Sequence, residues 1–133
     1  MPKPKILVVD DDPDLVRAMR VRLLANNYEV ATATDGYSAI ASAQKERPSL
    51  IILDLGLPAG DGFVVLDRLQ NSDVLAGIPV IVLSARDPQD NKERALKAGA
   101  AAFLQKPPDN DELLNMIRAT LGPANARLSA WPS

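Results

Sequence analysis

The chain has 133 residues, enough for one compact domain but too few for two complete hydrophobic cores. With 47% apolar residues, 24% charged residues and a net charge of −2, the composition is that of an ordinary globular protein and gives no overall attraction to nucleic acid or to anionic lipid. Because the chain lacks cysteine and histidine, disulfides, thiolate nucleophiles, Ser-His-Asp triads and zinc sites made of those ligands are excluded.

Five short aliphatic runs have the length of β-strands. Most of them lack polar alternation, which is typical of strands that are covered on both faces of a parallel sheet. The predicted strands are Ile6–Val9, Glu29–Ala33, Leu50–Leu53, Pro79–Leu83 and Ala102–Gln105. A segment with helical spacing follows each of them, so the order is strand then helix, repeated along the chain. The pattern predicts a single α/β domain with a doubly wound, five-stranded parallel sheet.

The first three helices have recognisable starts. Asp12 can cap a helix whose first residue is Pro13, and Asp35-Gly36 and Asp61-Gly62 offer similar openings. The second helix is expected to end before Pro48. The residues predicted to face inward from these helices are Val16, Met19, Leu23, Ala39, Ile40, Ala43, Phe63, Leu66 and Leu69.

The last two helices are predicted from about Asp90 and from about Asn110. The first of these ends where Gly99 can adopt a left-handed conformation, and the other is expected to stop at Gly122-Pro123. Leu114, Ile117 and Leu121 form the inward face of the final helix. Residues 1–122 are therefore predicted to form the domain, and residues 123–133 a tail or linker. Trp131 is either a tail residue or an anchor for a further domain.

The predicted location is cytoplasmic, without a membrane or direct nucleic-acid partner. Every aliphatic run is far shorter than a membrane span. The opening residues Met1 to Lys5 lead directly into a strand-like run instead of a signal peptide.

Polar side chains follow four of the predicted strands. Asp10 and Asp11 follow the first, Asp54 the third, Ser84 the fourth and Lys106 the fifth. In an open parallel sheet, ligands bind beyond the carboxyl ends of the strands, where the strand order reverses. We therefore expect these side chains to gather at one edge.

Carboxylates gathered in this way require a positive partner, because each pair within about 5 Å repels by roughly 3 kcal/mol at an effective dielectric near 20. Lys106 and a hard divalent cation can supply it, and an all-oxygen ligand set favours Mg²⁺. An aspartate beside a metal, a hydroxyl and an ammonium is arranged to attack phosphorus. Asp54 is the predicted nucleophile, forming an aspartyl phosphate, and Asp10 and Asp11 are predicted to hold the ion.

The chain resembles the response-regulator receiver domain of two-component signalling over residues 5 to about 121. The matching motifs are Ile6-Leu7-Val8-Val9-Asp10-Asp11-Asp12-Pro13, Leu53-Asp54-Leu55-Gly56-Leu57-Pro58 with Asp61-Gly62, Leu83-Ser84-Ala85, Gly99-Ala100 and Lys106-Pro107. The resemblance implies a flavodoxin-like (βα)5 fold with strand order 2-1-3-4-5. It also implies phosphorylation at Asp54, with Mg²⁺ held by Asp10, Asp11, Asp54 and the carbonyl of Gly56.

The same resemblance implies a switch. Ser84 and Lys106 contact the phosphoryl group, the Lys106-Pro107 bond is cis, and Phe103 changes rotamer when the Ser84 loop shifts. The implied phosphate donor is a sensor histidine kinase or phosphotransfer protein. The surface of the fourth helix, fifth strand and fifth helix is then available to a second copy or an output domain. The chain is thus expected to be a signalling switch that assists its own phosphorylation and dephosphorylation, not an enzyme.

Four positions depart from the common pattern of that family. Gly56 stands where a larger side chain is frequent, which leaves the phosphoryl site more open to water. Pro108 replaces a frequent Phe, Phe103 lacks the hydroxyl of Tyr, and Ser84 replaces Thr.

Other interpretations remain open at this point. The acidic run Asp10–Asp12 could be a solvated turn, and Phe103 could serve only for core packing. Arg17, Arg20 and Arg22 form either a solvated helix face or a docking surface for a kinase. Two other function classes are open. One is a Mg²⁺-dependent phosphatase with an aspartyl nucleophile, for which an Asp-x-Asp motif at one strand end is usual, and the other is a flavin-binding module, for which the loops offer no obvious ring-stacking pair.

Overall fold

The computed structural model describes residues 3–57, 62–85 and 88–130, and the side chains of these except 88–90 and 122–130. In this part of the chain, five parallel strands form one sheet in the order β2-β1-β3-β4-β5. They are β1 (Lys5–Val9), β2 (Glu29–Ala33), β3 (Leu50–Asp54), β4 (Val80–Ser84) and β5 (Ala102–Gln105). The predicted fold class and strand order are confirmed, and each strand bound lies within one residue of its prediction.

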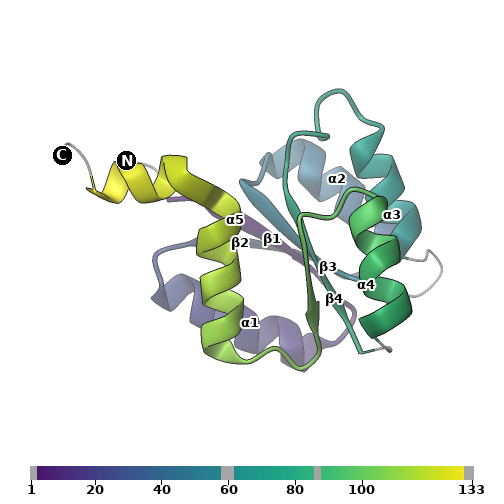
Figure 1. Ribbon diagram of the computed structural model, residues 1–133, viewed down its shortest axis with the longest axis horizontal. Helices are drawn as coiled ribbons and strands as arrows, with labels where there is room; N and C mark the ends of the chain where they lie inside the picture. The colour runs from purple at the N-terminus through teal and green to yellow at the C-terminus, as the bar shows by residue number, and fades with distance from the viewer. Residues whose placement is uncertain (1–2, 58–61, 86–87, 131–133) are drawn as a thin grey trace.

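Helices cover both faces of the sheet. They are α1 (Pro13–Ala25), α2 (Gly36–Glu46), α3 (Gly62–Gln70), α4 (Pro88–Lys97) and α5 (Asn110–Ala130). In Figure 1, α1 and α5 lie on one side of the strands and α2, α3 and α4 on the other. The result is a three-layer sandwich, as expected when each parallel crossover returns through a helix.

Two hydrophobic cores lie on opposite faces of the sheet, because successive side chains of a strand point to opposite sides. Leu7 and Val9 of β1 pack in the core beneath α2, α3 and α4. Ile6 and Val8 pack in the other core, with Met19 of α1 and other side chains from α1 and α5. All residues of β3 and β4 are buried, which explains why these strands carry no polar alternation.

Local capping explains where several helices begin and end. The Asp12 carboxylate accepts hydrogen bonds from the backbone N–H groups of Asp14 and Leu15, and Pro13 occupies the first helical position, as predicted. Asp35 and Ser38 form a capping box at the start of α2. Gly99 follows α4 with a φ of +106°, a conformation that favours glycine.

The predicted stop of the last helix at Gly122-Pro123 is wrong, because α5 continues to Ala130. An interior proline costs a backbone hydrogen bond and also clashes with the Cβ of the residue before it. That residue is Gly122, which has no Cβ, so one part of the expected penalty is absent. The domain boundary at residue 122 stays a prediction. One helix start also differs from its prediction: α4 begins at Pro88 instead of about Asp90.

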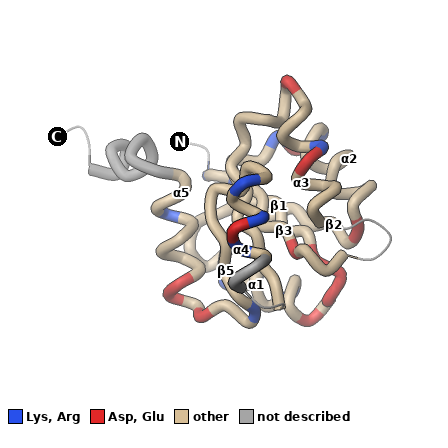
Figure 2. Tube along the Cα trace, turned by 45° about the vertical axis from the view of Figure 1, so that its right-hand side comes forward, with Lys and Arg blue, Asp and Glu red and all other residues tan. Residues whose placement is uncertain are grey.

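Several sequence predictions concern the surface. Arg17 and Arg20 are exposed and Arg22 is half-buried. Figure 2 shows acidic and basic residues interspersed along the described chain, including α4. No helix in the described ranges is long and apolar enough to cross a membrane. Asp61 and Trp131 lie outside the described residues.

Candidate functional site

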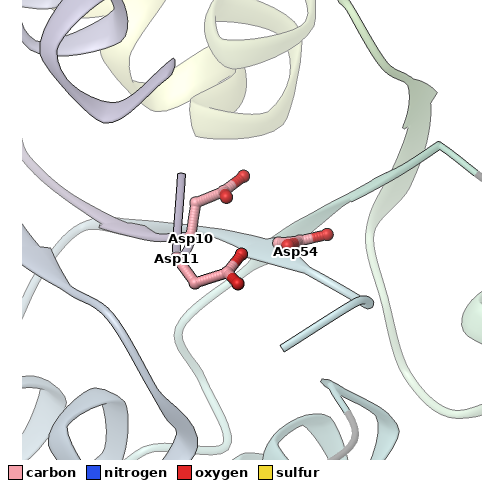
Figure 3. Close-up of side chains that lie close together, drawn as sticks. All are labelled: Asp10, Asp11 and Asp54. Carbon is pink, nitrogen blue, oxygen red and sulfur yellow. The ribbon is translucent and has the colours of Figure 1, made fainter. Parts of the chain in front are cut away.

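The acidic side chains of the site come from the ends of two adjacent strands. Asp10 and Asp11 follow β1, and Asp54 is the last residue of β3, which pairs with β1 through Val9 and Leu53. One carboxylate oxygen from each aspartate lies within 4.8 Å of the others. Figure 3 shows the three side chains extending in the same general direction from these strand ends. The tertiary structure therefore brings the predicted cluster together.

Two of the three carboxylates are buried. Asp10 is 1% exposed and Asp54 is 4% exposed, whereas Asp11 lies at the solvent side. Each buried carboxylate has one oxygen fixed by a backbone N–H two residues later. The Asp12 N–H donates to Asp10 Oδ1 at 2.9 Å, and the Gly56 N–H donates to Asp54 Oδ1 at 2.9 Å. These turns leave the Oδ2 atom of each residue for other partners.

Lys106 supplies the positive charge of the site. Its Nζ lies 2.7 Å from Asp10 Oδ2 and 3.3 Å from Asp54 Oδ2. Its side chain is 18% exposed, so both ion pairs lie largely out of water. The cis Lys106-Pro107 bond is present as predicted. One ammonium thus contacts both buried carboxylates.

The electrostatics of the cluster are those of crowded like charges. Burial raises the pKa of Asp10, and the charge of Asp54 adds to this, while hydrogen bonds from Lys106 and from the Asp12 N–H oppose it. For Lys106, burial by itself would lower the pKa. The hydrogen bond and charge of Asp10, together with the charge of Asp54, outweigh it and leave the pKa raised. The cluster therefore favours added positive charge.

The residues present fit a hard divalent cation. Asp10 Oδ2 is buried, and among the described residues it has no partner other than the Lys106 ammonium. Three carboxylates against one ammonium leave an excess of negative charge. All side-chain ligands in the cluster are carboxylate oxygens, the donor type that Mg²⁺ prefers. Asp10, Asp11 and Asp54 could hold such an ion.

Ser84 and Gly56 lie beside Asp54. Ser84 is buried at the end of β4, one residue beyond the Asp54–Leu83 register pair, and its carbonyl accepts the N–H of Lys106 at 2.9 Å. Gly56 is exposed, and a Cβ at this position would lie 3.5 Å and 3.7 Å from the two Asp54 carboxylate oxygens. A side chain at this position would therefore lie directly against the Asp54 carboxylate.

Phe103 lies on β5, buried in the core that faces α2, α3 and α4. Core packing by this ring is therefore part of the fold. Its switching role remains a prediction.

Sequence reasoning missed the contribution of the backbone. Asp12 was interpreted only as a helix cap, yet its N–H also orients Asp10. The corresponding role of the Gly56 N–H at Asp54 was likewise not foreseen. The available signal was an aspartate placed directly before a turn, where a carboxylate often accepts an N–H two residues on.

Comparison with known proteins gives consistent relatives. The family model described as "Response regulator receiver domain" matches residues 6–118. Transcriptional regulatory protein KdpE of Mycobacterium tuberculosis is 42% identical over 116 residues, covering 87% of this chain and 50% of that protein. The chain thus spans about half the length of this relative.

Solved structures share the fold at similar coverage. The receiver domain of Francisella response regulator 1452 matches with a TM-score of 0.83 at 30% identity, covering 93% of this chain and 99% of the other. The receiver domain of sensor histidine kinase PA1611 from Pseudomonas aeruginosa matches with a TM-score of 0.83 at 29% identity, covering 91% and 99%. That second structure was solved with a magnesium ion coordinated in its active site cleft.

Proposed function

This chain belongs to the response regulator receiver domain family, and from that premise we propose that it is a phosphorylation-dependent signalling switch with Asp54 as phosphoacceptor. The observation that carries the proposal is the shared ammonium of Lys106, which contacts the Oδ2 atoms of both Asp10 and Asp54. A lysine placed between two buried carboxylates can follow a new negative charge when one of them is esterified.

The two oxygens of Asp54 have different tasks in this proposal. Oδ1 accepts the Gly56 N–H, so Oδ2 is the atom left to attack. Asp54 Oδ2 forms a bond to phosphorus while the bond from phosphorus to the donor atom breaks and its electron pair leaves with the donor. Lys106, 3.3 Å from Oδ2, then pairs with a phosphoryl oxygen while keeping its contact with Asp10.

The metal residues of the proposal are Asp10, Asp11, Asp54 and the carbonyl of Gly56. When bound, Mg²⁺ supplies positive charge that offsets the carboxylate repulsion and neutralises the oxygens of the transferring group. The Asp12 N–H donates a hydrogen bond to Asp10 Oδ1 and so orients the Asp10 carboxylate. The more exposed Asp11 closes the solvent side of the cluster.

Ser84 and Phe103 form the proposed switch. A phosphoryl group adds about −1.5 to −2 charges at Asp54, which attracts the Ser84 hydroxyl and the Lys106 ammonium. The Lys106 N–H already bonds to the Ser84 carbonyl, so the ends of β4 and β5 are coupled. Phe103 lies on β5, the strand that ends just before Lys106. Its ring would then repack and alter the surface of α4, β5 and α5.

The partners follow from the same proposal. A sensor histidine kinase or a phosphotransfer protein would supply the phosphoryl group, and the altered surface of α4, β5 and α5 would bind a second copy or an output domain. We propose a cytoplasmic location, as for a partner of such kinases, and no direct contact with nucleic acid by this domain.

The proposal is tested by labelling the purified chain with acetyl phosphate and Mg²⁺, with intact mass as the readout. The wild type is expected to gain one phosphoryl group, and Asp54→Asn none. Asp73→Asn, which changes an exposed aspartate after α3, is the matched control and should be labelled like the wild type. Undiminished labelling of Asp54→Asn would refute Asp54 as acceptor. Sustained turnover of a small phosphomonoester would favour the phosphatase interpretation instead.

A further inference from the structure

Gly62, the first residue of α3, packs directly on the backbone that carries Asp54. Its N–H donates to the Leu55 carbonyl at 3.2 Å, and the residue is buried. A Cβ at this position would lie 2.6 Å from the Asp54 carbonyl oxygen and 2.6 Å from the Leu55 Cα. Both neighbours are backbone atoms, so no side-chain rotation can relieve the contact. Only a residue without a Cβ permits this approach.

Both sides of the contact are anchored. The Leu55 N–H donates to the Leu83 carbonyl at 3.0 Å, which extends the β3–β4 pairing past Asp54. On the helix side, α3 is held by buried side chains and by a guanidinium group that stacks on its first turn, with Arg94 Cζ 3.8 Å from the centroid of the Phe63 ring. The buried side chains of α3 are those of Phe63, Val65, Leu66 and Leu69. The start of α3 is therefore packed directly against the end of β3.

We propose that Gly62 is a positioning residue for the phosphoacceptor: it lets α3 set the location of the Asp54 carboxylate relative to Lys106. This inference rests on the proposed role of Asp54. The Asp54 side chain is short, so a shift of its backbone is passed on to Oδ2 and to its 3.3 Å contact with Lys106. A displacement of about 1 Å can lower the rate of a reaction that needs aligned groups about a hundredfold, and smaller displacements lower it less.

The substitution Gly62→Ala tests this role. The contact must widen from 2.6 Å to at least 3.0 Å, because real Cβ atoms essentially never come closer to another heavy atom. Leu55 is itself buried and its N–H bonds to the Leu83 carbonyl, so the displacement is shared between α3 and the Asp54–Leu55 peptide. Part of the displacement therefore reaches Asp54, and the rate of labelling by acetyl phosphate falls about three- to tenfold. The half-saturating donor concentration stays near the wild-type value, because the change affects alignment and not donor contacts.

Two variants control for effects on folding. Gly77→Ala makes the same chemical change at a position with no heavy atom within 4 Å of the added Cβ. Val64→Ala shortens an exposed side chain of the same helix without adding an atom against β3. Rates are taken per folded molecule, from circular dichroism at the assay temperature. Both controls are expected to be labelled at the wild-type maximal rate.

A crystal structure of Gly62→Ala gives a readout that does not depend on phosphorylation. The expected result is a longer or misaligned contact between Asp54 Oδ2 and Lys106 Nζ. Wild-type labelling by the folded variant, or an unmoved Asp54 with α3 displaced, would overturn the proposal. If the wild type itself takes no label, the proposed function fails, and the crystal structure still decides whether Gly62 positions Asp54.

If Gly62→Ala does not fold, Phe63→Leu tests the same packing of the start of α3 against the end of β3. This change loosens the first turn of α3 and removes the stacking on Arg94 while keeping the position apolar. A lower maximal rate with an unchanged half-saturating concentration supports the role of the helix start. A wild-type rate refutes it.

Discussion

Replacing Asp54 with asparagine should stabilise the metal-free protein, although it removes a native ion pair. The three carboxylates lie within 4.8 Å of one another, and at an effective dielectric near 20 each pair at that distance repels by about 3.5 kcal/mol. Asp54 thus meets about 7 kcal/mol of repulsion from two neighbours. The Lys106 ammonium, 3.3 Å from Asp54 Oδ2, contributes about 5 kcal/mol of attraction at the same dielectric.

Screening reduces this difference of about 2 kcal/mol, because Asp11 is exposed to solvent. The asparagine oxygen can still accept the Gly56 N–H, so that hydrogen bond is kept. We expect Asp54→Asn to raise the metal-free free energy of unfolding by about 1 to 2 kcal/mol, or about 3 to 8 °C in Tm. Asp10→Asn should be nearly neutral, because its 2.7 Å contact with Lys106 contributes about 6 kcal/mol of attraction.

The assay is thermal and urea unfolding in EDTA and again at increasing Mg²⁺. The wild type should gain stability with Mg²⁺ concentration according to its affinity, and Asp54→Asn should gain less. Asp73→Asn, an exposed aspartate distant from the cluster in sequence, serves as the control for loss of one negative charge. A less stable metal-free Asp54→Asn, or equal Mg²⁺ shifts in all variants, would refute the reasoning.

Two further predictions concern neighbouring contacts. Gly56→Leu should slow the loss of the phosphoryl group from Asp54 about three- to tenfold, which corresponds to about 0.7 to 1.4 kcal/mol in the activation barrier. The reason is that the leucine Cβ would fit 3.5 Å from Asp54 Oδ1, and its side chain would shield the phosphorylated carboxylate from water. A decay rate equal to that of the wild type, followed by intact mass, would contradict this. Arg94→Ala should lower the free energy of unfolding by about 0.5 to 1 kcal/mol through loss of the stacking on Phe63. Lys97→Ala, which removes an exposed ion pair on the same helix, should cost about 0.5 kcal/mol or less, and equal losses for both variants would argue against a specific contribution from the stacking.

The sequence was sufficient for the architecture because the relevant signals are local. Apolar runs without alternation indicate strands buried on both faces, and caps such as Asp12-Pro13 mark helix starts within a few residues. Once the strands are known to be parallel, their carboxyl ends share one edge, so the meeting of Asp10, Asp11 and Asp54 follows from the order of the elements.

The local signal for a helix end was misleading at Gly122-Pro123, because the unfavourable proline did not end the helix. Gly122-Pro123 has the composition of a helix end, yet α5 continues through it. A capping pattern states what a short segment prefers. It does not state whether the segment follows that preference in the folded chain.

Only the tertiary structure decided the clearances between segments distant along the chain. The 2.7 Å and 3.3 Å contacts that make Lys106 a shared partner of Asp10 and Asp54 depend on how the ends of β1, β3 and β5 are aligned. The close approach of Gly62 to the Asp54 backbone depends on how α3 sits on the sheet. Periodicity and capping are properties of a few consecutive residues, whereas distances of this kind arise only after the two cores have packed.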